Sequence, residues 1–185
     1  FMLVPVYTNI FSRHEFGTYS LIFTFIGFIQ IFYNYGMASV LMKFYSNDPH
    51  KKSTVITTAF ISLIVTSIIF SLFLIIFATP LSSILFSESR PDWFWYIAGI
   101  LFLDTISVRA LIIIRFENRP ILFTVIALAN VFVSLGANII LVYQYQMGIT
   151  GAIIATLMAS IASFLLTLHV VIKNLDFSKY SFDLF

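Results

Sequence analysis

Long apolar stretches separated by short polar connections make up most of this chain. Five stretches, at approximately 19–42, 53–79, 93–114, 121–143 and 151–172, are almost entirely apolar. A helix that crosses the hydrocarbon core of a bilayer needs roughly 20 such residues, so each stretch predicts a membrane-spanning helix. Residues 1–11 predict the end of another span, and because the chain starts at Phe1 rather than Met we expect a fragment of a longer protein. The period-two alternation of a membrane β-barrel is not visible.

Composition agrees with this pattern. Hydrophobic residues make up 60% of the chain and charged residues 10%, whereas soluble domains carry about 25% charged residues. This excludes a soluble enzyme, a nucleic-acid-binding module and a disordered protein. The predicted fold is an all-α integral membrane protein, a polytopic bundle of about six transmembrane helices with the first truncated. It forms a single lobe over residues 1–185, in which 173–185 are a cytoplasmic connector.

The basic residues predict the orientation, because cytoplasmic loops are enriched in Lys and Arg. Numbering the connections alternately places Arg13 and Arg90 on one side of the membrane. The other side receives the remaining loop cations, which are Lys43, Lys51, Lys52, Arg115, Arg119, Lys173 and Lys179. That side is therefore predicted to be cytoplasmic. Aromatic residues at 93, 95, 96, 143 and 145 gather at the predicted outer interface, as expected for an aromatic belt.

Small and polar residues recur at helical spacing in three spans. Apolar burial contributes little to helix association in lipid, so such residues mark packing faces or cavities. In the span 19–42 they are Ser20, Thr24, Gly27, Gln30 or Ile31, and Asn34. In the span 121–143 they are Asn130, Ser134 and Asn138, and in the span 151–172 they are Gly151, Ala155 and Ala159. We expect Gly27 and the residues of the last two spans to pack against helices, whereas Gln30 and Asn34 fit packing and cavity lining equally.

Two charged residues lie within the span 93–114. Asp104 is near its middle, and Arg109 lies about 9 Å inside its cytoplasmic end at 1.5 Å per residue. A charge at this depth is costly unless it is paired or hydrated. Their spacing of five places them about 140° apart around the helix, so we do not expect them to pair. Arg109 either extends to the cytoplasmic surface or acts in a cavity, and Asp104 either lines a hydrated cavity or bonds to a neighbouring helix.

The motifs of catalysis are missing from the sequence. It has no His-Glu-x-x-His, no P-loop and no Gly-x-Ser-x-Gly. The three His residues are scattered and there is no Cys, so neither a metal site nor a disulfide framework is predicted. We therefore predict a protein that is not an enzyme, without catalytic residues or a resident cofactor.

Several segments carry a resemblance to a known family. The segment Phe11-Ser12-Arg13-His14-Glu15-Phe16-Gly17-Thr18-Tyr19-Ser20 resembles the outer loop of bacterial polysaccharide-biosynthesis membrane proteins of the O-antigen flippase type. Three further segments resemble the same family. They are Gly36-Met37-Ala38 followed by Lys43-Phe44-Tyr45-Ser46, the basic loop 115–120, and the Gly-x-x-Gly-Ala entry at 148–152. These segments follow the family's order, spacing and sidedness, and the resemblance covers the whole chain.

The resemblance implies the multidrug/oligosaccharidyl-lipid/polysaccharide exporter superfamily, whose members have 12–14 helices in two lobes around a cavity. This chain would be most of the first lobe, in the bacterial cytoplasmic membrane, and the second lobe would be missing. The implied activity is transfer of an undecaprenyl-pyrophosphate-linked oligosaccharide to the outer leaflet by alternating access. The partners would be that lipid-linked glycan, membrane lipids, and polysaccharide polymerase or glycosyltransferase machinery. By position, Arg13, Lys43 and Arg109 are the candidates for a cationic cavity that holds the pyrophosphate.

Other functions remain open at this point. An exporter of drugs or metabolites coupled to H⁺ or Na⁺ would use acidic and amide residues such as Asp104. A peptidoglycan-precursor flippase is similar at this level. Outside transport, a structural membrane subunit would only require Asp104 to bond to a neighbouring helix, and Asp104→Asn would then leave transport unchanged.

Overall fold

The computed structural model describes residue 7 and residues 11–34, 49–86 and 89–174, without the side chains of 49–56 and 173–174. The expected span 1–11, apart from Tyr7 and Phe11, therefore lies outside the described residues. So do the end of the second expected span at 35–42, the candidate Lys43, and residues 175–185 of the expected connector.

The described residues are helical, with no strand among them. This confirms the predicted all-α class. Five of the helices contain stretches that are long and apolar enough to cross a membrane, which makes this a multi-pass membrane protein. In chain order the elements are α2 (Arg13–Asn34), α4 (Pro49–Ile76), α5 (Ala78–Leu85), α6 (Pro91–Phe116), α7 (Pro120–Asn138), the π-helix η1 (Ile139–Gln144) and α8 (Gly148–Asn174).

Helix starts follow local chemistry. At the start of α2, the Ser12 hydroxyl accepts a hydrogen bond from the Glu15 amide, and the Glu15 carboxylate accepts one from the Ser12 amide. This capping box satisfies two backbone donors that a helix start leaves open. Helices α6 and α7 each begin with a proline that follows an arginine N-cap, Arg90 and Arg119 respectively. Proline suits the first turn because its missing N–H would have had no partner there.

Two features of the helices differ from the expected spans. The third expected span, 53–79, is interrupted at Phe77, where α4 gives way to α5. Pro80 explains the interruption, because it cannot donate to the carbonyl four residues earlier and its ring crowds that carbonyl. The fifth expected span changes from α-helix to the π-helix η1 after Asn138. Such wide turns are rare and concentrate at functional sites.

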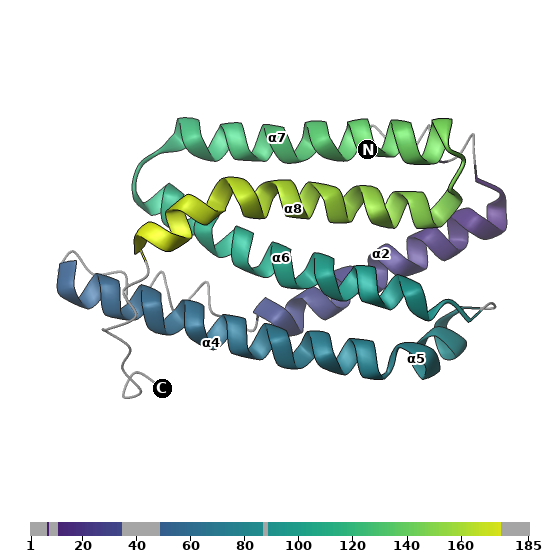
Figure 1. Ribbon diagram of the computed structural model, residues 1–185, viewed down its shortest axis with the longest axis horizontal. Coiled ribbons are helices and arrows are strands. Elements are labelled where there is room, and N and C mark those ends of the chain that lie inside the picture. The colour runs from purple at the N-terminus through teal and green to yellow at the C-terminus, as the bar shows by residue number, and fades with distance from the viewer. Residues whose placement is uncertain (1–6, 8–10, 35–48, 87–88, 175–185) are drawn as a thin grey trace.

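Helix α6 is the centre of the bundle. It packs on α8 and α4 most extensively and also contacts α2, α5 and α7. In Figure 1, α7, α8, α6 and α4 follow one another from top to bottom, and α2 crosses α6 obliquely. Of the most apolar stretch of each helix, 61% of the residues are buried in α6 and 11% in α2. Helix α2 is therefore attached at the edge of the bundle.

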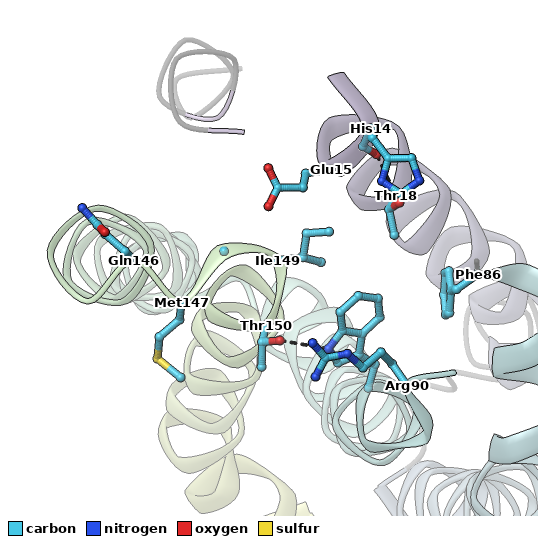
Figure 2. Close-up of a pocket in the computed structure, with 11 residues that line it drawn as sticks. His14, Glu15, Thr18, Phe86, Arg90, Gln146, Met147, Ile149 and Thr150 are labelled. Carbon is cyan, nitrogen blue, oxygen red and sulfur yellow. Dashed lines mark hydrogen bonds between the residues drawn. The ribbon is translucent and has the colours of Figure 1, made fainter. Parts of the chain in front are cut away.

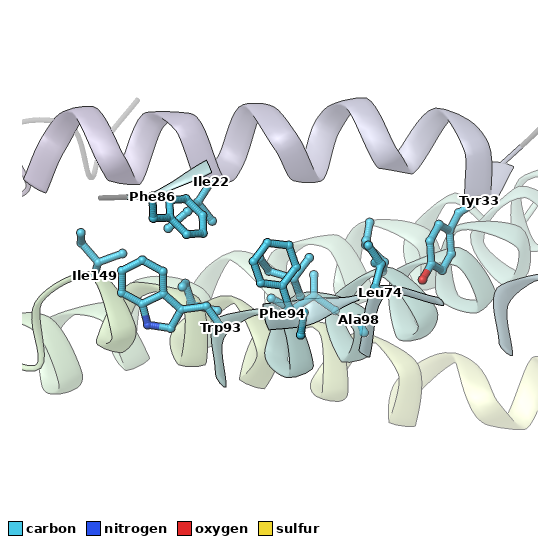
Figure 3. Close-up of a cluster of buried hydrophobic side chains, with 13 residues drawn as sticks. Ile22, Tyr33, Leu74, Phe86, Trp93, Phe94, Ala98 and Ile149 are labelled. Carbon is cyan, nitrogen blue, oxygen red and sulfur yellow. The ribbon is translucent and has the colours of Figure 1, made fainter. Parts of the chain in front are cut away.

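Two apolar clusters hold the bundle together. The first joins α2, α4, α6 and the start of α8 and includes Ile22, Tyr33, Phe94 and Ile97, all buried. Figure 3 shows Phe94 and Trp93 of α6 beneath α2, with Ile22 and Tyr33 descending to meet this layer. The second cluster joins α4, α6, α7 and α8 around Ala110 and neighbouring isoleucines. Close approach of α6 and α8 depends on Gly99, where an added Cβ would lie 3.3 Å from Leu157.

Candidate functional site

The helix bundle has two ends, the Trp93 end and the Arg115 end. The Trp93 end is where α2, α6 and α8 begin and where α5 and η1 lie. The Arg115 end is where α6 and α8 finish and where α4 and α7 begin. A helix of 22 residues such as α2 is about 33 Å long, so the two ends are a membrane thickness apart.

Arg109 binds the last residue of α2. Its Nη2 donates to the side-chain Oδ1 of Asn34 at 2.8 Å and to the backbone carbonyl of Asn34 at 3.2 Å. The side chain is only 3% exposed and its Nε has no partner among the described residues. A cation at a helix C-terminus also interacts favourably with the negative end of the helix dipole. Two of the predicted cavity residues therefore meet, roughly 10 Å from the end of α6.

A second polar connection to α2 lies beside the first. The Tyr33 hydroxyl is 2.9 Å from the Ser71 hydroxyl of α4, and Ser71 donates to the Ala98 carbonyl of α6 at 3.4 Å. Tyr33 is buried, at 1% exposed. The last turn of α2 is thus held to both α4 and α6 through polar groups, and neither Tyr33 nor Ser71 stood out in the sequence.

Asp104 lies on a different side of α6. Its carboxyl group is half-buried and lies beside the side chain of Ser160 on α8. Arg109 instead faces α2, as expected from their separation around the helix. The structure therefore offers Asp104 a helix–helix contact and does not pair it with Arg109.

One face of α2 is left open by the other described helices. Ser20, Thr24, Gly27 and Ile31, which share a helical stripe, are all exposed. Within the part of the chain that the structure describes, a side chain added at Gly27 would meet nothing within 4 Å, and the Thr24 hydroxyl bonds only to the Ser20 carbonyl of its own helix. Gln30 and Asn34 are half-buried at the border of this stripe. Gly27 is thus not at a packing face within the described chain.

An apolar hollow of about 300 Å³ lies between α2 and α4. We call it the α2–α4 hollow. Tyr33, next in sequence to the residue that binds Arg109, is part of its wall. The lining is otherwise Phe28, Ile29, Phe32, Phe70, Phe73 and Leu74. It has the surface that a hydrocarbon chain would contact.

A polar cavity of about 320 Å³ opens at the Trp93 end, where α2, α6 and α8 begin. We call it the Trp93-end pocket. Figure 2 shows Glu15 and Thr18 of α2 on one side, Arg90 below, and Ile149 and Thr150 of α8 opposite. A second hollow of about 570 Å³ shares Glu15, Gln146 and Gly148 with the first and adds Phe11 and Tyr143.

The wall of the Trp93-end pocket is fixed by contacts among its own residues. Trp93 Nε1 donates to the Thr150 hydroxyl at 2.9 Å, drawn as a dashed line in Figure 2. The Arg90 guanidinium lies 5.8 Å from the centre of the Trp93 ring, in the range of a cation–π contact. The Arg90 backbone N–H donates to the Ser82 hydroxyl of α5. The sequence predicts Trp93 only as part of an interfacial aromatic belt, and it uses Arg90 only as a signal of membrane orientation.

The expected packing residues of α7 and α8 lie where these helices meet. Asn130 Nδ2 donates to the Ala159 carbonyl at 3.1 Å and to the Ser163 hydroxyl at 2.7 Å. Asn138 accepts a 2.6 Å hydrogen bond from Tyr7 and donates to the Ser134 carbonyl of its own helix at 2.8 Å. Ala155 is fully buried, and at Gly151 an added Cβ would lie 3.2 Å from the Leu141 backbone of η1.

The remaining cationic candidates are not brought to Arg109. Arg13 is exposed at the start of α2, about 30 Å along the helix from Asn34. Lys43 lies outside the described residues. Among the described residues, no group of three His, Asp or Glu is close enough to hold a metal ion. The cationic constellation implied by the resemblance is therefore represented in the described chain by Arg109 alone.

The comparisons with known proteins bear on the whole chain. No curated protein and no solved structure shows a significant match to it. Residues 1–184 match the family described as polysaccharide biosynthesis protein, which confirms the resemblance drawn from the sequence. The chain therefore belongs to the polysaccharide biosynthesis protein family, a flippase-type family of membrane proteins.

Proposed function

We propose that this chain is part of a flippase that moves an undecaprenyl-pyrophosphate-linked oligosaccharide across the bacterial cytoplasmic membrane by alternating access. Its role would be in the synthesis of O-antigen, capsule or exopolysaccharide. Family membership supports a glycan-related substrate. The Arg115 end faces the cytoplasm in this proposal, because the basic loops gather there.

The observation that carries the proposal is that a buried cation binds the last residue of α2, and that α2 forms one wall of the α2–α4 hollow. Arg109 is a buried cation bound to Asn34, and the adjacent residue, Tyr33, lines the hollow. A polyprenyl pyrophosphate combines an apolar chain with an anionic group. The hollow offers the chain an apolar wall, and the guanidinium at the end of the same helix can bind phosphate oxygens bidentately.

The exposed stripe of α2 supports the same proposal. The Ser20 and Thr24 hydroxyls gain nothing from facing lipid chains, which offer no acceptor or donor beyond the helix carbonyl that Thr24 already uses. Exposed on this chain, they fit the wall of a hydrated path whose opposite wall comes from further helices of the full-length protein. This is the arrangement expected of transporters built from two related lobes.

The proposal is tested by the export of glycan in a strain that lacks the gene. Wild-type protein should restore export, and the lipid-linked precursor should otherwise accumulate in the inner leaflet. We expect Arg109→Met to reduce export about tenfold or more, because it removes a charge-assisted contact to the anionic group, and Arg109→Lys to retain part of it. Normal export by Arg109→Met at normal protein level would remove Arg109 from the mechanism.

A matched variant separates substrate binding from the attachment of α2. Asn34→Leu also removes the side-chain bond of 2.8 Å, but it keeps the guanidinium and the backbone acceptor. If Arg109 acts on the substrate, Arg109→Met should impair export more than Asn34→Leu at equal membrane insertion. Equal losses in the two variants would show that Arg109 only fixes α2.

A second function, ion-coupled export of drugs or metabolites, is favoured only by Asp104. This carboxyl group is half-buried near the middle of α6, and a carboxylate at this depth is a candidate for carrying H⁺ or binding Na⁺. For an ion-coupled exporter, Asp104→Asn should abolish dependence on the ion gradient. If Asp104 only bonds to Ser160, the same variant should transport normally, because an amide can accept that bond too.

A further inference from the structure

The two hollows at the Trp93 end form one trough. The Trp93-end pocket and the second hollow share Glu15, Gln146 and Gly148, so these residues lie along the boundary between them. Their volumes, about 320 Å³ and about 570 Å³, fall in the range of small-molecule sites. We call the combined feature the outer trough. It is roughly a helix length away from Arg109 and so is separate from the site above.

The lining of the outer trough combines donors and acceptors of both charges. The Glu15 carboxylate caps α2 through Oε2 and also lines the pocket. Arg90 and His14 also line the pocket and carry N–H donors, and Thr18 contributes a hydroxyl. The negative charge of Glu15 opposes binding of a free phosphate or a phospholipid phosphate. A neutral ligand with many hydroxyl groups can use carboxylate, guanidinium and hydroxyl groups together.

An aromatic ring and a strained turn complete the trough. The Tyr143 side chain is 65% exposed and lines the second hollow. An exposed aromatic ring is a surface on which the C–H face of a sugar ring can lie. The turn from η1 to α8 contains Gln146 at a φ of 50°. Glutamine rarely adopts this left-handed conformation, and backbone strain of this kind concentrates at functional sites.

We propose that the outer trough is a saccharide-binding site that holds one or two sugar units of the transported glycan at the outer face of the membrane. The identity of the ligand as the transported glycan rests on the proposed function, whereas the site itself rests on the trough. In this proposal Glu15, Arg90 and Gln146 bind sugar hydroxyls, and Tyr143 provides the stacking surface.

Intrinsic fluorescence gives a direct test. The sequence contains two tryptophans, and Trp95 is 62% exposed on α6, away from the pocket lining. In full-length protein reconstituted in phosphatidylcholine nanodiscs, Trp95→Phe removes this second emitter while keeping an aromatic side chain, and any tryptophan outside these 185 residues is likewise replaced by phenylalanine. Trp93, part of the trough wall, then reports on binding. The probe is the free oligosaccharide released by mild acid from the lipid-linked pool of the source strain, and inorganic pyrophosphate is titrated separately.

We expect the oligosaccharide to produce a saturable change in Trp93 emission. Arg90→Ala and Glu15→Gln should each weaken it about tenfold or more, because a charged hydrogen-bonding group is lost. Glu15→Gln keeps an acceptor for the Ser12 amide, so the cap of α2 is preserved. Arg119→Ala is the matched control, since Arg119 is also an N-cap before a proline but lies at the opposite end, and it should titrate as the parent does.

Three results would overturn the proposal. These are no response to the oligosaccharide, a response to pyrophosphate in its place, or an equal loss in Arg119→Ala. If the titration gives no response while cells with Trp95→Phe export glycan normally, the saccharide site in the outer trough is rejected and the proposed function is retained. Saturable binding in a protein whose deletion leaves export unchanged would reject the proposed function and retain a saccharide site.

Discussion

Helices α6 and α2 have similar lengths and both could cross a membrane, yet the bundle uses them in opposite ways. The apolar stretch of α6 is 61% buried, and that of α2 is 11% buried. Helix α6 is surrounded by four other helices and α5, whereas α2 touches the bundle along one edge and is held at its last turn by polar bonds. The comparison shows that an apolar composition does not distinguish a helix packed on all sides from a helix with an open face.

The largest expected difference is between two phenylalanines. Phe94 of α6 is fully buried, with Phe25 and Phe86 rings 5.7 and 6.0 Å away, whereas Phe28 of α2 is 57% exposed. Phe94→Ala should lower the free energy of unfolding by about 3 kcal/mol through lost packing, and Phe28→Ala by less than about 0.5 kcal/mol. Reversible unfolding in mixed micelles measures both. Similar losses would mean that α2 is as well packed as α6.

Two glycines, one in α6 and one in α2, test the same difference in packing with a smaller expected effect. Gly99→Val should destabilise the protein by about 1–3 kcal/mol, since even its Cβ would lie 3.3 Å from Leu157. Gly27→Val has open space around it, so its melting temperature in detergent should match the parent. If the exposed face of α2 lines the transport path, Gly27→Val should nevertheless reduce glycan export. Unchanged export would instead place this face towards lipid.

The polar attachment of α2 should contribute less. Tyr33→Phe removes the hydroxyl bonded to Ser71 and should cost about 0.5–1 kcal/mol, the usual value for a hydrogen bond between membrane helices. Tyr145→Phe, on a ring that is 70% exposed, is the control and should be neutral. Thermal unfolding of the two variants side by side gives the answer. A neutral Tyr33→Phe would show that apolar contacts alone hold the end of α2.

The smallest effect on stability is expected from two single-cysteine variants. They measure whether each position can be reached by a water-soluble reagent. These 185 residues contain no cysteine, so single cysteines are introduced after any cysteine elsewhere in the full-length protein has been replaced by serine. Thr24→Cys on α2 and Phe132→Cys on α7 both lie about half-way along exposed helices and should change stability by less than about 0.5 kcal/mol. A membrane-impermeant maleimide should label Thr24→Cys and spare Phe132→Cys. Equal protection would contradict a hydrated path beside α2.

Sequence reasoning succeeded where the residue type leaves few choices. Span length follows from bilayer thickness, so the all-α membrane fold could be predicted. Asn130 could be expected at a helix contact because an amide in lipid needs a partner, and it bonds to α8. The separation of Asp104 from Arg109 followed from helix geometry.

Other features depend on information that the spans do not contain. These helices are apolar on all faces, so periodicity does not reveal which face packs, and the exposure of Gly27 could not be foreseen. The partner of Arg109 depends on how α2 crosses α6, which is a tertiary property. The Trp93-end pocket brings together residues from four separate segments, and the π-helix after Asn138 has no proline or glycine at its start to announce it.

The bond between Arg109 and Asn34 has a consequence for binding equilibria. An anion that binds the guanidinium bidentately through Nη2 must displace Asn34, so its apparent affinity is reduced by the free energy of that bond. A bond of about 1.4 kcal/mol would reduce the affinity about tenfold. Linkage is reciprocal, so the same anion, once bound, would favour the release of the end of α2 by the same factor. In this way, one hydrogen-bonded pair can couple the binding of an anion at Arg109 to a movement of the end of α2.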